Sequence, residues 1–332
     1  MNLLASLRYL VALSEHRHFA RAAQACHITQ PALSNALRAL EKEFGITIVQ
    51  RSRTYAGLTP EGERVLASAQ RMLHEHALLA QDLHSTLARP QGVLRLGVVP
   101  TAVPMAARFA ALLQAAQPGI KPVLRSMSSP EIEAGLANFS LDIGLGFVER
   151  VKKRGSPFAA QVQYSEHYFL LRRKPRAEKR KSHTELASGK LPGKALAFGP
   201  ATTWQAAAQV PLCLLTPEMH HRSIVDAAFA KAGSPVVPVM ETNSILSLVL
   251  AVAAGQMSSV LPGSLVAVAQ GQALEHGGLQ ALPLVEPTVS TPMGFITLAQ
   301  AEPSRVLQAA LALVGQAPWR AELARHSGTL TR

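Results

Sequence analysis

Hydrophobic residues in the first part of the chain recur every three or four positions, which is the spacing of amphipathic helices. One helix is predicted over 3–13 and a second over 19–26, whose small and apolar residues share a face. A third begins after a short connector, with Thr29 placed to cap it and Pro31 in its first turn. The pattern therefore predicts two helices joined by a tight turn and covered by the first helix.

The third helix separates apolar and polar side chains onto opposite faces. Leu33, Leu37 and Leu40 face inward. The outer face carries amide, hydroxyl and guanidinium groups, which can read base edges in the major groove of DNA. The DNA-binding residues expected here are Thr29, Gln30, Pro31, Ser34, Asn35 and Arg38. The alternative is an ordinary helical hairpin with a polar outer face.

A β-hairpin is predicted directly after these helices. Short strands around Ile46 and Leu58 flank a basic turn. Arg51 and Arg53 in that turn can contact phosphates or a narrow minor groove. Hairpin and helices together make a winged helix-turn-helix, expected as a DNA-binding domain over 1–58.

The segment from His18 to Glu63 resembles the DNA-binding domain of the LysR-type transcriptional regulators. The resemblance rests on the order of the motifs FARAA, QPALS, LEKEFG and LTPEG. It implies a transcriptional regulator that binds double-stranded DNA, with RNA polymerase as a further candidate partner. Many members carry Arg after the Ser of QPALS, where this chain has Asn35. Asparagine favours adenine, so the base preference of the family is not carried over.

A long helix is predicted from Thr59, its cap, to about Ala88. Its apolar residues form a seam that a small winged domain cannot bury alone. The seam consists of Val65, Leu66, Ala69, Met72, Leu73, His76, Leu79, Ala80, Leu83 and Leu87. Pairing with a second copy makes 59–89 a dimerisation helix and the protein a homo-oligomer, a dimer or a tetramer. The alternative is packing of the seam on the chain's own C-terminal part.

Predicted strands and helices alternate beyond a Pro–Gly hinge at 90–92. The strands are 93–98, 123–127, 142–147, 211–215, 236–240 and 293–298, and the helices are 104–116, 130–138, 220–232, 244–254 and 304–314. Such alternation predicts open parallel sheets covered by helices. A break near 150–165 indicates a second lobe.

The expected fold class is therefore α/β, with a two-lobed effector domain behind the winged helix-turn-helix and the dimerisation helix. Lobe 1 is expected over 93–163 and 270–320, and lobe 2 over 164–269. This arrangement resembles both the periplasmic solute-binding proteins and the effector domain of the LysR family, so the resemblance covers nearly the whole chain.

Four strand-to-helix junctions place hydroxyl, amide or imidazole groups at a helix start. Ligands of open α/β sheets bind beyond the carboxyl ends of the strands, and helix starts favour small anions. The effector-binding residues expected there are Thr101, Ser128, Ser129, His220 and Asn243, with His221 as the neighbour of His220. Plain helix capping is the alternative for each. The effector half contains the segments GVLRLGVVPTAVP, RSMSSPEIEAGLANFSLDIGLGF and ETNSILSLVLAVAAGQMSSVLP. In these segments it resembles the regulators of cyanate and formate dehydrogenase operons, which implies a small anionic effector such as formate.

The chain contains 33 Lys and Arg against 21 Asp and Glu, a net charge of +12. The excess lies far from the predicted recognition helix, because residues 150–181 hold eleven Lys and Arg against two Asp and Glu. The segment 172–185 is predicted to be a solvated loop. A non-specific nucleic-acid contact is the alternative.

Two isolated cysteines, Cys26 and Cys213, are typical of a reduced cytosolic protein. The most apolar run, 245–254, is too short to cross a membrane. The N-terminus lacks the basic-then-apolar order of a signal peptide. The sequence therefore predicts a cytoplasmic protein with no membrane partner.

Two patterns that could indicate an enzyme are incomplete. Gly144 and Gly146 follow a strand, but Glu149 stands where a dinucleotide-binding loop needs its third glycine. His220 and His221 point to different faces of a helix, which suits a shared metal poorly. No catalytic residue, metal site or cofactor is predicted. The alternative function is a small-anion-binding protein or enzyme of the same two-lobed fold with only non-specific DNA contacts.

Overall fold

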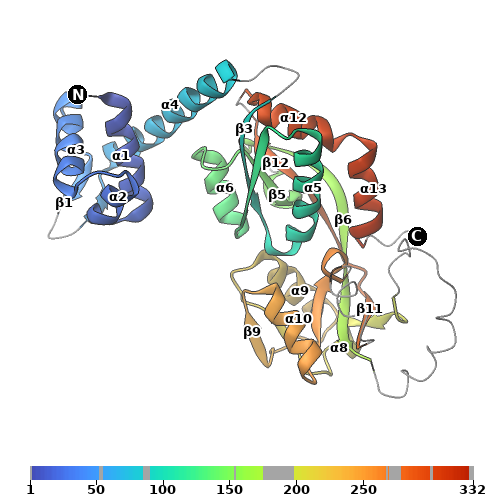
Figure 1. The fold of residues 1–332 in the computed structure, drawn as a ribbon. Coiled ribbons are helices and arrows are strands. Elements are labelled where there is room, and N and C mark those ends of the chain that lie inside the picture. The colour runs from blue at the N-terminus through green and yellow to red at the C-terminus, as the bar shows by residue number, and fades with distance from the viewer. Residues whose placement is uncertain are drawn as a thin grey trace. The chain divides into compact units, whose positions relative to one another are not determined.

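The computed structural model of the protein divides the chain into two compact units (Figure 1). The first unit is Met1–Ala88 with Asn138–Ser140, and the second is Arg89–Ala137 with Leu141–Arg332. The residues that the structure describes are 2–51, 55–84, 90–152, 155–174, 198–266, 268, 278–299 and 302–328. Among the helices within these ranges, none combines the length and the apolar character of a membrane span.

Three helices and a β-hairpin make up most of the first unit, as predicted. The helices are α1 (Leu3–His16), α2 (Phe19–Ala25) and α3 (Gln30–Phe44), and the hairpin joins β1 (Val49–Arg51) to β2 (Tyr55–Leu58). The core between them consists mainly of leucine and alanine side chains from all three helices. The winged helix-turn-helix fold is thereby confirmed.

Local backbone chemistry determines the turn between α2 and α3. His27 takes a positive φ of 56°, which reverses the chain after α2. Thr29 then caps α3, because its hydroxyl accepts a hydrogen bond from the Ala32 N–H at 3.4 Å. The helix ends at Gly45, whose φ of 68° suits glycine.

A long helix, α4 (Pro60–His84), follows the hairpin. Its predicted cap is confirmed, since the Thr59 hydroxyl accepts a hydrogen bond from the Gly62 N–H at 2.9 Å. Glu61 and Glu63 lie in the first turn, at the positive end of the helix dipole.

The second unit contains two lobes that share the long strand β6 (Phe158–Arg173). In lobe 1, β3 (Gly92–Val98) pairs in parallel with β4 (Ile120–Ser126) and β5 (Ile143–Phe147), and β12 (Ser290–Leu298) lies antiparallel between β5 and β6. The helices of lobe 1 are η1 (Pro100–Ala102), α5 (Val103–Ala116), α6 (Ser129–Ala137), α7 (Val148–Val151), α12 (Arg305–Val314) and α13 (Ala317–His326).

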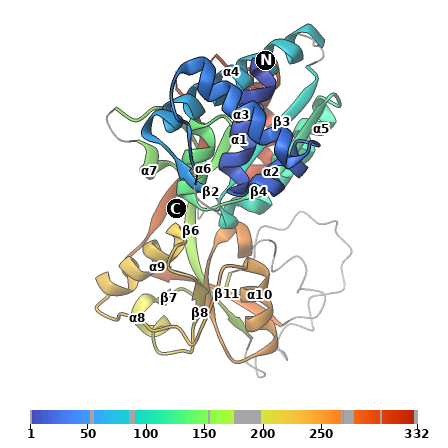
Figure 2. The same ribbon diagram turned by 90° about the vertical axis from the view of Figure 1, so that its left-hand side faces the viewer.

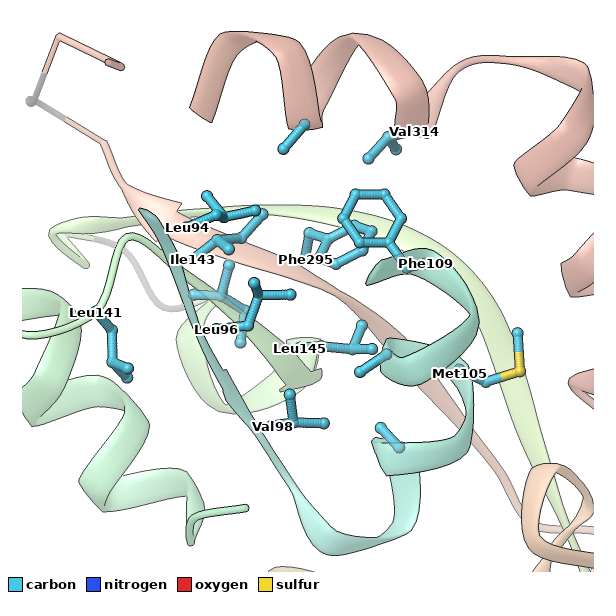
Figure 3. Packing of buried hydrophobic residues seen from close by; sticks show 14 of the residues in the cluster. Leu94, Leu96, Val98, Met105, Phe109, Leu141, Ile143, Leu145, Phe295 and Val314 are labelled. Atoms are coloured by element: carbon cyan, nitrogen blue, oxygen red, sulfur yellow. The ribbon is translucent and has the colours of Figure 1, made fainter. Parts of the chain in front are cut away.

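Buried side chains fill both faces of the lobe 1 sheet (Figure 3). Phe109 of α5 and Val314 of α12 pack over Phe295 on one face. Leu141 lies on the other face, beside α6. A Cβ on Gly97 would come within 2.5 Å of the Leu141 side chain, so glycine is needed for this face to close.

Lobe 2 is built on the second half of β6, which Figure 2 shows passing from one lobe into the other. The strands β10 (Ser259–Pro262) and β11 (Leu279–Val285) pair antiparallel with this half, and β11 pairs in parallel with β7 (Thr202–Thr203). A separate parallel pair joins β8 (Cys213–Leu215) to β9 (Met240–Thr242). The helices of lobe 2 are α8 (Trp204–Ala207), α9 (His220–Lys231) and α10 (Ile245–Ala254).

The structure differs from the sequence predictions in several respects. The expected lobe boundary at 163/164 falls inside β6, and β11, expected in lobe 1, pairs within lobe 2. The large sheet mixes parallel and antiparallel pairs, whereas parallel sheets were predicted. The strand predicted over 236–240 begins only at Met240, after Pro238, which has no N–H to donate to a sheet.

Candidate functional site

The recognition helix α3 presents its polar face to solvent. Gln30, Asn35 and Arg38 are exposed, and Ser34 is half-buried. The Arg38 guanidinium donates a hydrogen bond to the Asn35 side-chain oxygen at 3.3 Å, which holds these two side chains together. A helix fixed by its apolar face in a small domain, with its polar face open, can enter the major groove.

The remaining predicted DNA contacts lie at the start of α3 and in the hairpin. Thr29 and Pro31 are exposed at the helix start. The side chain of Arg51 and the whole of Arg53 lie outside the described residues. The residues predicted to contact DNA from Thr29 to Arg38 thus share one face and the start of α3.

The second half of α4 leaves its apolar side chains uncovered. Leu66 is buried in the core of the first unit, and Leu73 packs against that core. By contrast, Met72 is 50% exposed, Leu79 60% and Leu83 76%. The predicted seam thus divides into a half that stabilises the winged domain and an exposed half suited to a second copy.

A small pocket lies between the two lobes of the second unit. It is lined by Val99, Pro100, Thr101, Ser128, Ser129, Phe147, Leu215, Met219, His220 and His221. Its empty volume is about 230 Å³, part of which is open to solvent. Because that volume includes open solvent, the enclosed part is only about the size of a single water molecule, and the pocket suits a ligand of very few atoms.

Strand ends and helix starts position the polar side chains of the pocket. Thr101 lies in η1, directly after β3, and Ser129 begins α6, shortly after β4. These parallel neighbours end at the same edge of the sheet. His221 comes from lobe 2, in the first turn of α9. Two of the four predicted junctions thus meet in lobe 1, and a third faces them from lobe 2.

Thr101, Ser129 and His221 are buried, with exposed fractions of 1%, 7% and 3%. Among the described residues, nothing forms a hydrogen bond with the two hydroxyls or with either ring nitrogen of His221. Buried polar groups are normally paired, with protein, ordered water or ligand. These atoms are left open to pair with a water molecule or a ligand.

Ser128 and His220 also line the pocket, but their polar atoms have partners. Ser128 donates to the Glu131 carboxylate from its hydroxyl at 2.7 Å and its N–H at 2.8 Å, and these bonds lower the pKa of Glu131. His220 Nε2 lies 3.5 Å from Glu149, and its Nδ1 lies 3.3 Å from the Ser223 hydroxyl. These two residues shape the pocket more than they offer free donors.

His221 is neutral at physiological pH. Burial, with His220 nearby, lowers the pKa of His221 to about 4. Its ring lies 5.6 Å from the Tyr168 ring, centroid to centroid. A neutral imidazole offers one N–H donor and one acceptor, so this residue binds through hydrogen bonds rather than through a full positive charge.

Asn243 is exposed between β9 and α10 and does not line this pocket. His221 takes the more central place, although the sequence singled it out only as the neighbour of His220. A signal was present, because His221, Val225 and Ala228 recur at helical spacing and form the buried face of α9.

Metal and thiol chemistry find little support. No group of three or more His, Cys, Asp or Glu is placed to hold a metal ion in the part of the chain that the structure describes. Cys26 lies half-buried in the first unit and Cys213 buried in the second. Burial raises the pKa of both thiols, which lowers their reactivity.

The chain matches the LysR substrate binding domain over residues 87–318 and the bacterial regulatory helix-turn-helix protein, lysR family, over residues 4–63. The first match alone covers more than half of the chain. The chain therefore belongs to the LysR family. Its two matched regions are the helix-turn-helix domain and the substrate-binding domain of that family.

Individual proteins are similar to this chain in sequence over part of its length or in overall structure. A probable hydrogen peroxide-inducible genes activator of Streptomyces viridosporus is 45% identical over 101 residues, which are 30% of this chain and 32% of that protein. Among solved structures, a full-length OxyR variant from Pseudomonas aeruginosa has a TM-score of 0.64 at 23% identity, covering 94% of this chain and 97% of that chain. Full-length CbnR complexed with its target DNA has a TM-score of 0.60 at 18% identity, covering 94% and 98%.

These similarities concern the fold and parts of the sequence. The two solved structures show the fold alone, because their identities are low. The chain spans less than half the length of the curated relatives that it matches first. Those relatives are named for hydrogen peroxide, so the resemblance to cyanate and formate regulators remains a proposal.

Proposed function

We propose that this regulator binds an operator as a dimer or tetramer and responds to a small anion, with formate as the first candidate. The observation that carries the proposal is the pocket where Thr101, Ser129 and His221 bring unpartnered polar atoms together from both lobes.

A ligand in this pocket gains from groups that are otherwise unsatisfied. Leaving a buried donor or acceptor unpaired costs about 1–3 kcal/mol per group. A formate ion has two acceptor oxygens, which match the hydroxyls of Thr101 and Ser129 and an N–H of His221. Because these residues belong to both lobes, a bound ion favours the lobe angle at which it reaches all of them.

The charges around the pocket favour a small singly charged ion. α6 and α9 both begin at the pocket, and the N-terminal end of a helix attracts anions. The side chains of Glu131 and Glu149 lie just behind Ser128 and His220. Their carboxylates repel any anion, and they repel a more highly charged anion most.

Hydrogen peroxide is the second candidate, because the relatives are named for it. Sensing by cysteine oxidation needs an accessible thiolate. Cys213 is fully buried, and its thiol donates to the Ser258 carbonyl oxygen at 3.5 Å. Cys26 belongs to the first unit, and burial raises its pKa as well. Reversible binding of peroxide in the pocket stays open to test.

The DNA-binding part of the proposal combines α3 with the exposed half of α4. Each copy offers one recognition helix, and a symmetric dimer would read an interrupted inverted repeat. Effector binding would alter how that operator is held, and RNA polymerase would respond to the change. Because the chromosome of a bacterium lies in the cytoplasm, we place this function there.

The proposal is tested by selecting genomic fragments with the full-length protein and footprinting them with and without sodium formate. We expect enrichment of fragments that share an interrupted inverted repeat, and a footprint that formate changes. Thr101→Val should retain the fragments but lose the change. The matched control is Thr297→Val on β12, outside the pocket, which should behave as the wild type.

Two outcomes would contradict the proposal separately. Failure to enrich any shared site would refute operator binding. Enrichment with a footprint unaltered by formate, cyanate, bicarbonate and acetate would refute the small-anion effector alone. A change produced by hydrogen peroxide and by none of the anions would favour the second candidate.

A further inference from the structure

Glu166 is completely buried at the point where β6 passes from one lobe to the other. In the sheet it lies opposite Thr291 of β12. Two residues further on, Tyr168 already pairs with Pro262 of β10, in lobe 2. A carboxyl group therefore occupies the joint between the lobes, where a charge is costly.

One hydroxyl connects this carboxyl to the pocket. Ser264, which follows β10, has its Oγ 3.2 Å from the Thr101 carbonyl oxygen and 3.5 Å from Glu166 Oε1. The first of these contacts joins lobe 2 to lobe 1 at a residue that lines the pocket. A serine hydroxyl has one hydrogen, so its two acceptors compete for it.

Among the described residues, the neighbours that act most on the pKa of Glu166 are two hydroxyls and a carboxylate. Burial is the main cause that raises the pKa of Glu166 to about 8, and Glu149 of α7 raises it further. The hydroxyls of Ser264 and Tyr164 lower it. Glu166 therefore carries its proton at neutral pH.

The other groups near Glu166 leave its carboxyl group protonated at neutral pH. The Tyr168 hydroxyl is engaged with Thr291 at 2.8 Å, and burial raises the pKa of both Tyr164 and Tyr168. From α9, His221 is neutral and His220 lies beside Glu149. The Tyr164 hydroxyl acts on Glu166 without the geometry of a hydrogen bond, so Glu166 Oε2 has no partner among the described residues.

We infer that Glu166 is a proton-carrying positioning residue at the joint between the lobes, which acts through Ser264 on Thr101. With its proton, Glu166 is a weak acceptor and leaves the Ser264 hydrogen to the Thr101 carbonyl. When Glu166 releases its proton to solvent, the carboxylate is the stronger acceptor and takes the Ser264 hydrogen bond. The Thr101 carbonyl then loses its bond to lobe 2, and the joint loosens beside the pocket.

The joint should therefore tighten at neutral pH and loosen at alkaline pH. This part stands without any effector. A further consequence rests on the proposed function: if the pocket binds formate, its affinity should fall as Glu166 ionises, because Thr101 is less firmly held.

The direct test is hydrogen exchange of the full-length protein at pH 6.5 and pH 9, expressed as protection factors that correct for the intrinsic rate. In wild type, the segment around Thr101 should lose protection about two- to tenfold at the higher pH, the range that corresponds to one ordinary hydrogen bond. Glu166→Gln keeps the shape without the titration, so its protection should not change with pH. Ser264→Ala should show low protection at both.

Helix α12 is the internal reference, because it lies in lobe 1 and contributes no residue to the pocket. Equal loss of protection in α12 and around Thr101 would show general destabilisation and overturn the inference. The inference is also overturned if Glu166→Gln retains the wild-type pH dependence, or if Ser264→Ala leaves protection unchanged.

If Glu166→Gln fails to fold, infrared spectroscopy of wild type and Ser264→Ala tests whether Glu166 carries its proton. Wild type should show a protonated carboxyl band at pH 6.5 that disappears near pH 8, and in Ser264→Ala the band should persist to higher pH, because the Ser264 hydroxyl lowers the pKa of Glu166. Absence of that band in wild type at pH 6.5 would overturn the inference. Formate calorimetry at the same two pH values separates the proposals: no binding at either pH refutes the effector, while the exchange data still decide the joint.

Discussion

Thr101 of lobe 1 and His221 of lobe 2 line one pocket, and their buried side-chain polar atoms have no hydrogen-bond partner among the described residues. A single small ligand can satisfy both. Since a ligand shifts an equilibrium only through different affinities for its states, this pair gives a ligand a way to select one lobe angle. The pocket therefore connects binding chemistry to a change of shape.

The recognition helix should read base sequence through Ser34 and Asn35. Replacing both by Ala should weaken operator binding by roughly 1–3 kcal/mol per lost base contact, with little effect on unrelated DNA. Arg53→Ala should instead weaken all sequences alike and flatten the salt dependence, because its expected partner is phosphate. Binding titrations on operator and random duplexes at several salt concentrations make the comparison. Unchanged discrimination by the double variant would place base reading elsewhere.

The exposed half of α4 should hold the oligomer together. Leu79 is 60% exposed in one chain, so Leu79→Lys should leave the chain folded but bury a charge between paired helices. Light scattering should show dissociation, with operator binding lost. The control, Ala67→Lys, adds the same charge at an exposed position outside the seam and should keep the oligomer. An unchanged oligomer for Leu79→Lys would contradict the paired-helix prediction.

Two buried groups should give stability a characteristic pH dependence. The pKa of Glu166 rises from 4.5 to about 8 on folding, so the folded chain holds one more proton over that range and stability falls as pH rises through it. The pKa of His221 falls from 6.5 to about 4, so its contribution is lost as pH drops below 6.5. The two slopes oppose one another below pH 6.5, and the Glu166 slope remains alone above it.

Urea unfolding of wild type and Glu166→Gln between pH 6.5 and 8 isolates this slope. The free energy of unfolding of wild type should fall relative to the variant by up to about 1.4 kcal/mol per pH unit. His221→Asn should remove the loss of stability below pH 6.5. Parallel curves for wild type and Glu166→Gln would mean that Glu166 does not carry its proton in the folded chain.

Arg222 should hold the start of α9 against β8 and β9. Its guanidinium donates to the Leu215 carbonyl oxygen at 2.8 Å, to Glu241 at 2.6 Å and to Asp226 at 2.8 Å. Arg222→Met should cost about 1.5–3 kcal/mol in denaturant unfolding, the contribution of a hydrogen bond with a charged partner, because Asp226 and Glu241 remain partly hydrated. Arg125→Met, at an exposed position of β4, is the control and should change little.

The first unit was predictable because its signals are local. The cap at Thr29, the stop at Gly45 and the inward spacing of Leu33 and Leu37 act within a few residues of one another. Strand β6 was not, because polar residues interrupt its pattern and find partners far along the chain. Gln163 accepts a hydrogen bond from the Trp319 indole N–H at 2.9 Å, and Glu166 accepts one from the Ser264 hydroxyl at 3.5 Å.

The same distinction applies to the pocket. Strand-to-helix junctions predicted Thr101 and Ser129, because the chain itself places them at helix starts. Whether a hydroxyl is free depends on neighbours, and Ser128 is engaged by Glu131. The greater importance of His221 over His220 depends on how α9 rotates against lobe 1, which a single sequence does not specify.

The most direct test of the effector site is titration calorimetry of the full-length protein at pH 7 with formate, cyanate, bicarbonate, acetate and hydrogen peroxide. We expect one of the small anions to bind wild type and the Thr297→Val control equally. Thr101→Val removes a donor and keeps the shape, so its affinity should fall about fivefold to more than a hundredfold, as the loss of about 1–3 kcal/mol requires. Equal affinity of Thr101→Val and wild type would remove Thr101 from the site, and no binding by any anion would contradict the small-anion account.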